Sequence, residues 1–389
     1  MSKSFLIHLF YYTIFFPFVS ILPIGSDLQP VFIIIMFFII GFKFINFSKK
    51  DSFLLFIAIS SLCYFNFFTY SLIPFKGVGA YLSIFISLFF LMVYEKVFNI
   101  TIFISVLKRT IIIYFFSSIL FYLFPNIFSL FQLNFVRAVN TLDAGIGYRG
   151  ISTYFTEPGL FGAHMVGLLV LLIGIFNKGL IQIKTCLVYG LMILIMIILS
   201  KSGMGYLYLF FIVLYIIFIN RKKTKILLPL IISFSVLSVF KLKSILEFNR
   251  GIGALISLSD YNNITDLSIL KRVYDFFLGF FILMEYPLGM GVNFTQSKVI
   301  SIINSSEFLN NFYNVNRDIG FVSSISLFFA YYGVFTVFLL IFLLKKYKPS
   351  FINGFYFFCF LSFSFSGAYP IIWVLLIQDY VLKNKIISN

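Results

Sequence analysis

Long apolar runs follow one another along the whole chain and are separated by short polar breaks. Runs of about 20 apolar residues are long enough to cross a bilayer core as helices. β-barrel spans would instead appear as alternating segments of about ten residues, and these runs do not alternate. The pattern predicts an all-α polytopic integral membrane protein with ten to twelve transmembrane helices. The twelve candidate spans lie at roughly 4–22, 30–47, 52–70, 77–94, 110–129, 158–176, 181–200, 203–220, 226–240, 319–344, 351–366 and 368–382.

The polar breaks divide the chain into five predicted regions. Within the fourth, the apolar stretch Phe276–Met284 is too short to span a bilayer. We expect it to lie in the interface or to form a re-entrant element. A second apolar stretch, Val97–Leu107, is predicted to lie at the inner interface. The regions are N-terminal transmembrane helices at 1–129, a first outer loop at 130–157, central transmembrane helices at 158–240, a large outer loop at 241–318 and C-terminal transmembrane helices at 319–389.

Composition agrees with a membrane protein. Apolar residues make up 61% of the chain and charged residues 11%, whereas an ordinary soluble domain carries about 25% charged residues. The net charge of +16 is explained by the Lys and Arg that membrane proteins concentrate in cytoplasmic loops, so no nucleic-acid partner is expected. Cys63, Cys186 and Cys359 lie within apolar runs and are expected to be buried thiols, not disulfides or metal ligands.

Basic clusters set the predicted orientation. With the N-terminus inside, four clusters fall on the cytoplasmic side: Lys49-Lys50, Lys108-Arg109, Arg221-Lys222-Lys223 and Lys345-Lys346. Both termini are therefore predicted to be cytoplasmic. Arginine departs from this rule, because the outer segments hold five of the seven arginines but only six of the 22 lysines. Arginine is the better bidentate partner for phosphate. Pairing of these arginines with outer acidic residues is the alternative.

The first candidate site surrounds Pro158. Proline is favoured at the first helical position and forces an extended residue before it, so a helix is predicted to start there with Thr156 or Glu157 as its cap. The free N–H groups of a helix start attract anions. Arg149 precedes Glu157 by eight residues and is predicted to bind phosphate. His164 follows by two turns, so Glu157 and His164 are a candidate acid/base pair. Alternatively, Glu157 is a cap paired with Arg149, and His164 only hydrogen-bonds a neighbouring helix.

A second candidate site lies in the large outer loop. Lys271 and Arg272 precede its short apolar stretch, and Pro287-Leu-Gly-Met-Gly291 follows it. The basic pair is predicted to bind substrate phosphate, while the glycines let the backbone come close to a ligand. The alternative is an interfacial helix whose Lys and Arg reach toward water. Arg250 is a weaker candidate for the phosphate role, and Lys201, in a tight outer turn, is another.

These motifs resemble a known family. Arg149-Gly-Ile-Ser-Thr-Tyr-Phe-Thr-Glu157-Pro158-Gly is similar to the arginine-to-Glu-Pro segment of the bacterial O-antigen and capsule polysaccharide polymerases, the Wzy family. Arg272, the Pro-Leu-Gly-Met-Gly run and Tyr332-Gly333 are similar to the second half of those proteins and of O-antigen ligases. The plan of many spans with one large outer loop in the second half is also similar. The resemblance implies a GT-C-like fold.

The resemblance further implies a polysaccharide polymerase at the outer face of the bacterial inner membrane. Its donor would be a growing glycan on undecaprenyl diphosphate, and its acceptor a single lipid-linked repeat unit. In this scheme the two basic sites bind the diphosphate, and Glu157 or His164 orients or deprotonates the acceptor hydroxyl. No metal or cofactor is required. The expected partners are the undecaprenyl-diphosphate-linked oligosaccharide, the lipid bilayer and a chain-length regulator protein.

Two other functions stay open. An O-antigen ligase would pass the finished glycan to another acceptor, and the sequence hardly separates it from a polymerase. A flippase of lipid-linked oligosaccharides would also have about twelve spans. For a flippase, however, we expect short outer loops and charges that face a central cavity, whereas here the long outer loops carry the charges.

Overall fold

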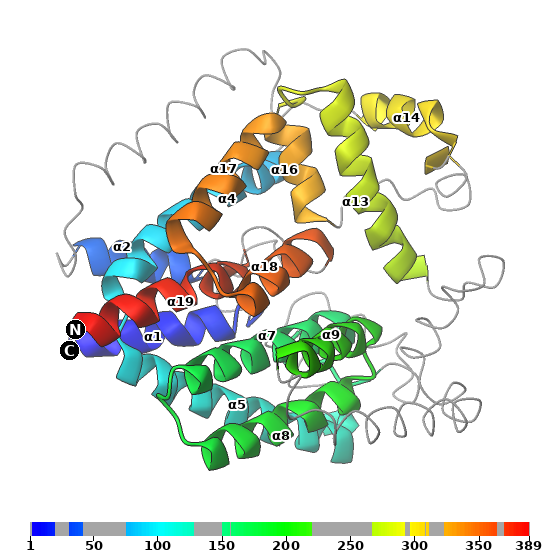
Figure 1. Ribbon diagram of the computed structural model, residues 1–389. Helices are drawn as coiled ribbons and strands as arrows, with labels where there is room; N and C mark the ends of the chain where they lie inside the picture. The colour runs from blue at the N-terminus through cyan, green and yellow to red at the C-terminus, as the bar shows by residue number, and fades with distance from the viewer. Residues whose placement is uncertain are drawn as a thin grey trace. The chain divides into compact units, whose positions relative to one another are not determined.

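The computed structural model is helical throughout its regular parts (Figure 1). It describes residues 2–19, 31–41, 75–127, 150–155, 157–219, 267–291, 296–307, 309–310, 323–363 and 369–388. Its helices are α1 (Lys3–Phe15), α2 (Val31–Gly41), α4 (Phe75–Val97), α5 (Ile100–Leu123), α7 (Pro158–Asn177), α8 (Ile183–Ser200), α9 (Gly203–Ile219), α13 (Leu267–Glu285), α14 (Gln296–Ser305), α16 (Ser324–Tyr332), α17 (Val334–Tyr347), α18 (Phe351–Phe363) and α19 (Pro370–Ser388).

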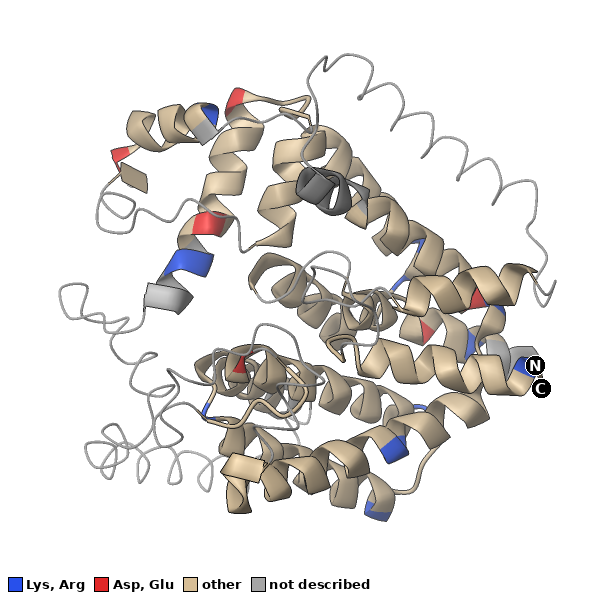
Figure 2. Cartoon of the chain, turned by 180° about the vertical axis from the view of Figure 1, so that it is seen from behind, with Lys and Arg blue, Asp and Glu red and all other residues tan. Residues whose placement is uncertain are grey.

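Three of the described helices are long and apolar enough to cross a membrane, namely α5, α7 and α8. Shorter apolar helices include α2, part of α9 and α18. Most of the helical ribbon in Figure 2 is tan, so charged residues are sparse along the described helices. The predicted all-helical fold is confirmed for the described residues, and these apolar helices are consistent with a membrane protein. The predicted total of twelve spans stays a prediction, since the candidate spans at 52–70 and 226–240 lie outside the described residues.

The chain forms two compact units. Unit 1 consists of Met1–Pro17, Pro30–Val106 and Leu270–Asn389, and unit 2 of Phe18–Gln29 and Leu107–Ile269. The first turns of α5 therefore belong to unit 1 and the rest of that helix to unit 2. The five regions expected from the sequence stay predictions.

Unit 1 is built around α19. This helix is apolar on all sides and buried from Ile371 to Ile377, as expected for the central helix of a bundle. It contacts α1, α4, α17 and α18. At one end of the α18–α19 hairpin, Asp379 accepts hydrogen bonds from the Ser350 backbone N–H at 2.8 Å and from the Asn353 amide at 2.6 Å. The Asp379 carboxylate thereby caps the start of α18 and fixes the short α17–α18 connection.

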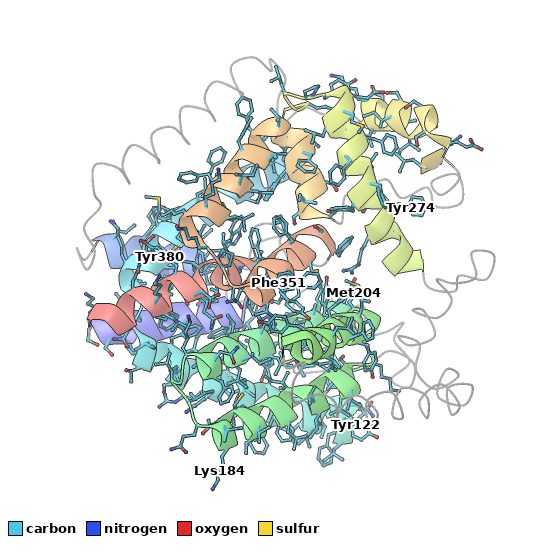
Figure 3. All side chains as sticks on the ribbon, viewed as in Figure 1. Tyr122, Lys184, Met204, Tyr274, Phe351 and Tyr380 are labelled. Carbon is cyan, nitrogen blue, oxygen red and sulfur yellow. The ribbon has the colours of Figure 1, made fainter. Side chains whose placement is uncertain are left out.

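Unit 2 is built around α7. Residues from Phe161 to Leu172 are buried, and the helix packs against α8 and α9. Its outer helices expose apolar side chains. On α8, Ile183, Leu187 and Leu191 follow one another at four-residue spacing on the exposed face. Lys184, at the start of the same helix, points away from unit 2 (Figure 3). Such continuous apolar faces suit a hydrocarbon environment.

Two helices differ from the predicted spans. The predicted span 110–129 begins earlier, because Ile100–Leu123 is one continuous helix that includes Lys108 and Arg109. The placement of Val97–Leu107 at the inner interface stays a prediction. A run that includes two charges can remain helical because Lys and Arg are good helix formers. The predicted span 319–344 is instead split at Gly333 into α16 and α17.

Candidate functional site

The start of α7 has the geometry that the sequence predicts. Pro158 occupies the first helical turn, and Glu157 is the N-cap residue, with extended backbone angles of φ −141° and ψ 145°. The extended conformation follows from the steric clash between a proline ring and the residue before it. The predicted helix start is therefore confirmed to the residue.

The Glu157 carboxylate does not serve as a cap. It is exposed and makes no side-chain hydrogen bond to the first turn of α7. At Gly159, an added Cβ atom would meet nothing within 4 Å. Within the described part of the chain, the first turn thus has open space at Gly159, beside an exposed carboxylate. This arrangement leaves both the carboxylate and the positive end of the helix dipole accessible to a ligand.

The loop Gly150–Phe155 before α7 is fixed against the end of α8. The Ile151 N–H donates to the Leu199 carbonyl at 3.1 Å. A Cβ atom added at Gly150 would overlap the Ser200 carbonyl, so no larger residue fits that backbone path. The Phe155 N–H closes the loop on the Ser152 carbonyl at 2.9 Å.

Tyr154 also holds this loop in place. The Tyr154 hydroxyl lies 2.9 Å from the Ser117 hydroxyl on α5. Its ring meets the Tyr114 ring edge-on, with centroids 5.7 Å apart. Tyr154 therefore joins the loop to α5.

The α8–α9 turn braces the first turns of α7 from the other side. The Ser202 hydroxyl accepts from the Gly205 N–H at 3.0 Å, and its Cβ and Oγ atoms would lie within 2.8 Å of a Cβ atom added at Gly162. Gly205 in turn faces the Gly162 backbone. Small residues at these positions let α7 and α9 approach closely, as in other membrane helix pairs.

Two residues without a glycine's freedom adopt left-handed backbone conformations here. They are Thr153, with φ 46°, and Lys201, with φ 48°. Each costs about 1–2 kcal/mol, and a β-branched residue such as threonine is especially unusual in this region. The two segments that hold them are in contact through Gly150 and Ser200. Strained residues that gather beside an accessible helix start motivate a functional hypothesis for this place.

His164 is placed differently from Glu157. It is wholly buried on α7. Its ring centroid lies 4.9 Å from that of Phe155 and 5.6 Å from that of Tyr114. Glu157, by contrast, is exposed. The predicted acid/base pair stays a prediction, and the aromatic surroundings give His164 a packing role as well.

Arg272 lies on α13 in unit 1 and is buried, with 9% of its surface exposed. Its Nη1 atom donates to the carbonyl of Phe363, the last residue of α18, at 2.7 Å. Arg272 therefore satisfies one of the free carbonyl groups at the end of that helix. The other N–H groups of Arg272 and the ammonium of the half-buried Lys271 are the groups that would bind phosphate. Phosphate binding at this place stays a prediction.

The glycines of the Pro287–Gly291 run were expected to bring the backbone close to a ligand. At Gly289, with φ 84°, an added Cβ atom would instead lie 2.6 Å from the Tyr331 carbonyl oxygen and 2.8 Å from the Gly333 nitrogen. The Val334 N–H donates to the Pro287 carbonyl at 2.7 Å, and the Met290 N–H to the Ala330 carbonyl at 2.7 Å. The close approach is thus to the protein's own backbone, at the junction of α16 and α17.

Two of the residues predicted to bind phosphate, Arg149 and Arg250, lie outside the described part of the chain. Sequence reasoning did not single out Gly150, Thr153 and Gly162 as supports of the α7 start. The available signal was the run of small residues in the α8–α9 turn. Among the described residues, no group of three or more His, Cys, Asp and Glu side chains gathers as metal ligands would.

No protein-family model matches the chain, and no curated protein matches it.

Proposed function

We propose that the protein is a membrane glycosyltransferase that polymerises undecaprenyl-diphosphate-linked repeat units at the outer face of the bacterial inner membrane. The observation that carries the proposal is the position of Glu157 at the start of α7. Its carboxylate is exposed and makes no capping hydrogen bond to the helix. The resemblance of the Arg149–Pro158 segment to the Wzy family supplies the substrate class. The braced loop Gly150–Phe155 supports a preorganised site, because catalytic groups need a rigid frame.

The proposed reaction uses the helix start and Glu157 for different tasks. The acceptor sugar hydroxyl attacks the anomeric carbon of the donor, forming a C–O bond, while the bond from that carbon to the diphosphate oxygen breaks. Undecaprenyl diphosphate leaves as an anion, which Arg149 and the N–H groups of the first turn of α7 stabilise. Glu157 orients the hydroxyl and accepts its proton.

Glu157 is preferred over His164 as the base. A base must come within hydrogen-bond reach of the hydroxyl that it deprotonates. Glu157 is exposed at the helix start, whereas His164 is buried between Phe155 and Tyr114. We therefore assign His164 to support of the loop that precedes the helix.

The experiment is a gene deletion scored by the glycan ladder and complemented with variants. Arg149→Ala and Glu157→Ala should each leave single-repeat glycans while the protein inserts at normal levels. Arg149→Lys should also fail if bidentate phosphate contact matters. Matched controls are Arg109→Ala and Glu307→Ala, which remove exposed charges elsewhere in the described chain and should restore the full ladder.

The same experiment separates the alternatives. Lipid-linked polymer without surface glycan after the deletion would indicate a ligase, and inward-facing lipid-linked units would indicate a flippase. A full ladder in both Arg149→Ala and Glu157→Ala would remove the proposed site.

A further inference from the structure

α13 exposes a stripe of large apolar side chains. Phe277, Phe280 and Met284 recur at three- and four-residue spacing, which places them on one face of the helix. Leu288 continues the stripe in the turn after the helix. Met284 is 78% exposed and Leu288 65%. Exposed contiguous apolar surface of this kind marks a place where something other than water is in contact.

Two charged residues of α13, Arg272 and Asp275, face the interior of the protein. Arg272 is buried, and Asp275 is 1% exposed. Arg272 donates to the Phe363 carbonyl, and the Asp275 carbonyl accepts from the Ser326 hydroxyl at 2.6 Å. A surface helix of a water-soluble protein turns its charged residues outward. Here Arg272 and Asp275 face inward and the large apolar groups outward, whereas Lys271 is half-buried and Glu285, at the end of the helix, is exposed. Inward-facing charges beside an outward apolar face are the distribution found where the surroundings are hydrocarbon.

The buried face of α13 also has its own apolar core. Tyr274, Leu278 and Ile282 pack with Val299 and Ile302 of α14. Tyr274 is labelled on α13 in Figure 3. α13 therefore has two apolar faces. One is buried against α14, and the exposed stripe is a separate face.

A second exposed apolar stripe lies on α17. Leu288 lies against Gly333, since a Cβ atom added there would approach the Leu288 carbonyl carbon within 2.6 Å. α17 begins one residue later and exposes Phe335, Phe338 and Phe342 along its outer face, with Phe338 64% exposed. Two helices of unit 1 thus each expose an apolar face, and the Pro287–Gly291 turn links them.

Polar and aromatic groups flank this surface in the way expected at a membrane boundary. The Lys298 ammonium lies 5.8 Å from the centre of the Tyr286 ring, just beyond the end of α13. Tyrosine and lysine are typical of the headgroup level, where rings and long stems meet both water and hydrocarbon. In Figure 1, α13 also runs steeply across the direction of α18 and α19 in unit 1.

We propose that the Phe277–Leu288 stripe is a lipid-contacting face, seated on the acyl chains of the bilayer, and that α13 is an interfacial helix. The occupant is phospholipid hydrocarbon because α13 and α17, which are linked at the Pro287–Gly291 turn, each expose an apolar helix face, unlike a closed groove for one ligand. The inward-facing Arg272 and Asp275 and the outward-facing large apolar side chains favour hydrocarbon over water as the neighbour of this face. The inference is independent of the proposed glycosyltransferase activity.

The experiment uses the single tryptophan of the chain, Trp373, which is buried. In a Trp373→Phe background, tryptophan is placed separately at Phe280 and at Met284, so that a folding defect at one position leaves the other informative. Each full-length variant is reconstituted into phosphatidylcholine vesicles with brominated acyl chains. Ser301→Trp, on the exposed polar face of α14, is the matched control.

Tryptophan at positions 280 and 284 should emit at blue-shifted wavelengths and lose emission to the brominated lipid, while tryptophan at 301 should lose emission to aqueous iodide. Because these vesicles contain no polyprenyl lipid, quenching reports phospholipid chains. Quenching of positions 280 and 284 by iodide alone would mean that the stripe faces water. Quenching by neither agent would mean that protein covers it. Either result overturns the proposal.

Discussion

Thr153 combines two unfavourable features in one residue. Its backbone is left-handed, and its Oγ1 atom is buried with no hydrogen-bond partner among the described residues. A buried hydroxyl without a partner costs about 1–3 kcal/mol. Thr153 lies in the loop that leads to α7. Two unfavourable features in one residue indicate that the backbone path of this loop is retained for function, at a cost in stability.

Thr153→Gly should therefore stabilise the protein and reduce its activity. Glycine removes the left-handed strain and the unpartnered hydroxyl, and this outweighs the entropy that glycine adds to the unfolded chain, for a net gain of about 1 kcal/mol. The melting temperature in detergent should rise, and the glycan ladder should shorten as the loop loses its fixed path.

Thr336→Gly is the control for this prediction. Thr336 is also buried, but it is helical and donates to the Phe328 carbonyl at 2.9 Å, so glycine there should lower the melting temperature. A lower melting temperature for Thr153→Gly would show that the threonine side chain contributes more than its backbone strain removes.

At the scale of elements, the junction of α16 and α17 shows how a broken helix is satisfied. Gly333 has φ 56° and ψ −135°, and the two helices diverge from it (Figure 1). A helix break inside a membrane protein frees backbone groups that need partners. The turn after α13 supplies them through Pro287 and Met290. The same contacts fix the end of α13. Gly289 and Gly333 thus position α13 against the α16–α17 junction, which lies further along the chain.

Gly333→Ala should lower the melting temperature markedly. Alanine is strained at this positive φ, and its Cβ atom would overlap the Pro287 carbonyl. The expected cost is about 1–3 kcal/mol or more, measured by thermal unfolding in detergent.

The matched control is Gly354→Ala within α18. The nearest atom to an added Cβ there is Cγ of Pro349 at 3.5 Å, an ordinary contact, and alanine is the better helix former by about 1 kcal/mol. Gly354→Ala should be neutral or stabilising. Equal melting temperatures for the two variants would show that the junction at Gly333 is not rigid.

At the scale of the whole molecule, basic residues at helix ends argue for an orientation. The end of α17 carries Lys345 and Lys346, and Lys346 pairs with Glu95 at 3.3 Å. Such a partly exposed ion pair contributes little stability. The excess of positive charge is better explained by membrane orientation.

Reporter fusions test this orientation. Fusions after Gly179 and after Lys348 should behave as cytoplasmic, whereas a fusion after Ser257 should behave as periplasmic. The measurements are alkaline phosphatase activity for outer positions and fluorescence of a green fluorescent protein for inner ones. A cytoplasmic signal after Ser257 would overturn the predicted topology, and with it the placement of the second outer loop.

The sequence by itself determined the local features of this protein. Pro158 set the start of α7, and the apolar runs set the bounds of α7, α8 and α9 within a few residues. These features follow from interactions between near neighbours in the chain, namely proline sterics and the length of hydrocarbon-compatible helices. The helical membrane class follows in the same way.

The tertiary structure decided what the chemically interesting residues contact. Arg272 donates to Phe363, 91 residues away, and Gly289 packs on Gly333. His164 is buried within α7, while Glu157, the N-cap residue of the same helix, is exposed. The sequence showed these residue types but not their partners, because such contacts depend on which distant helices pack together. Local pattern determines where a helix starts, and packing determines whether its side chains meet water, lipid or protein.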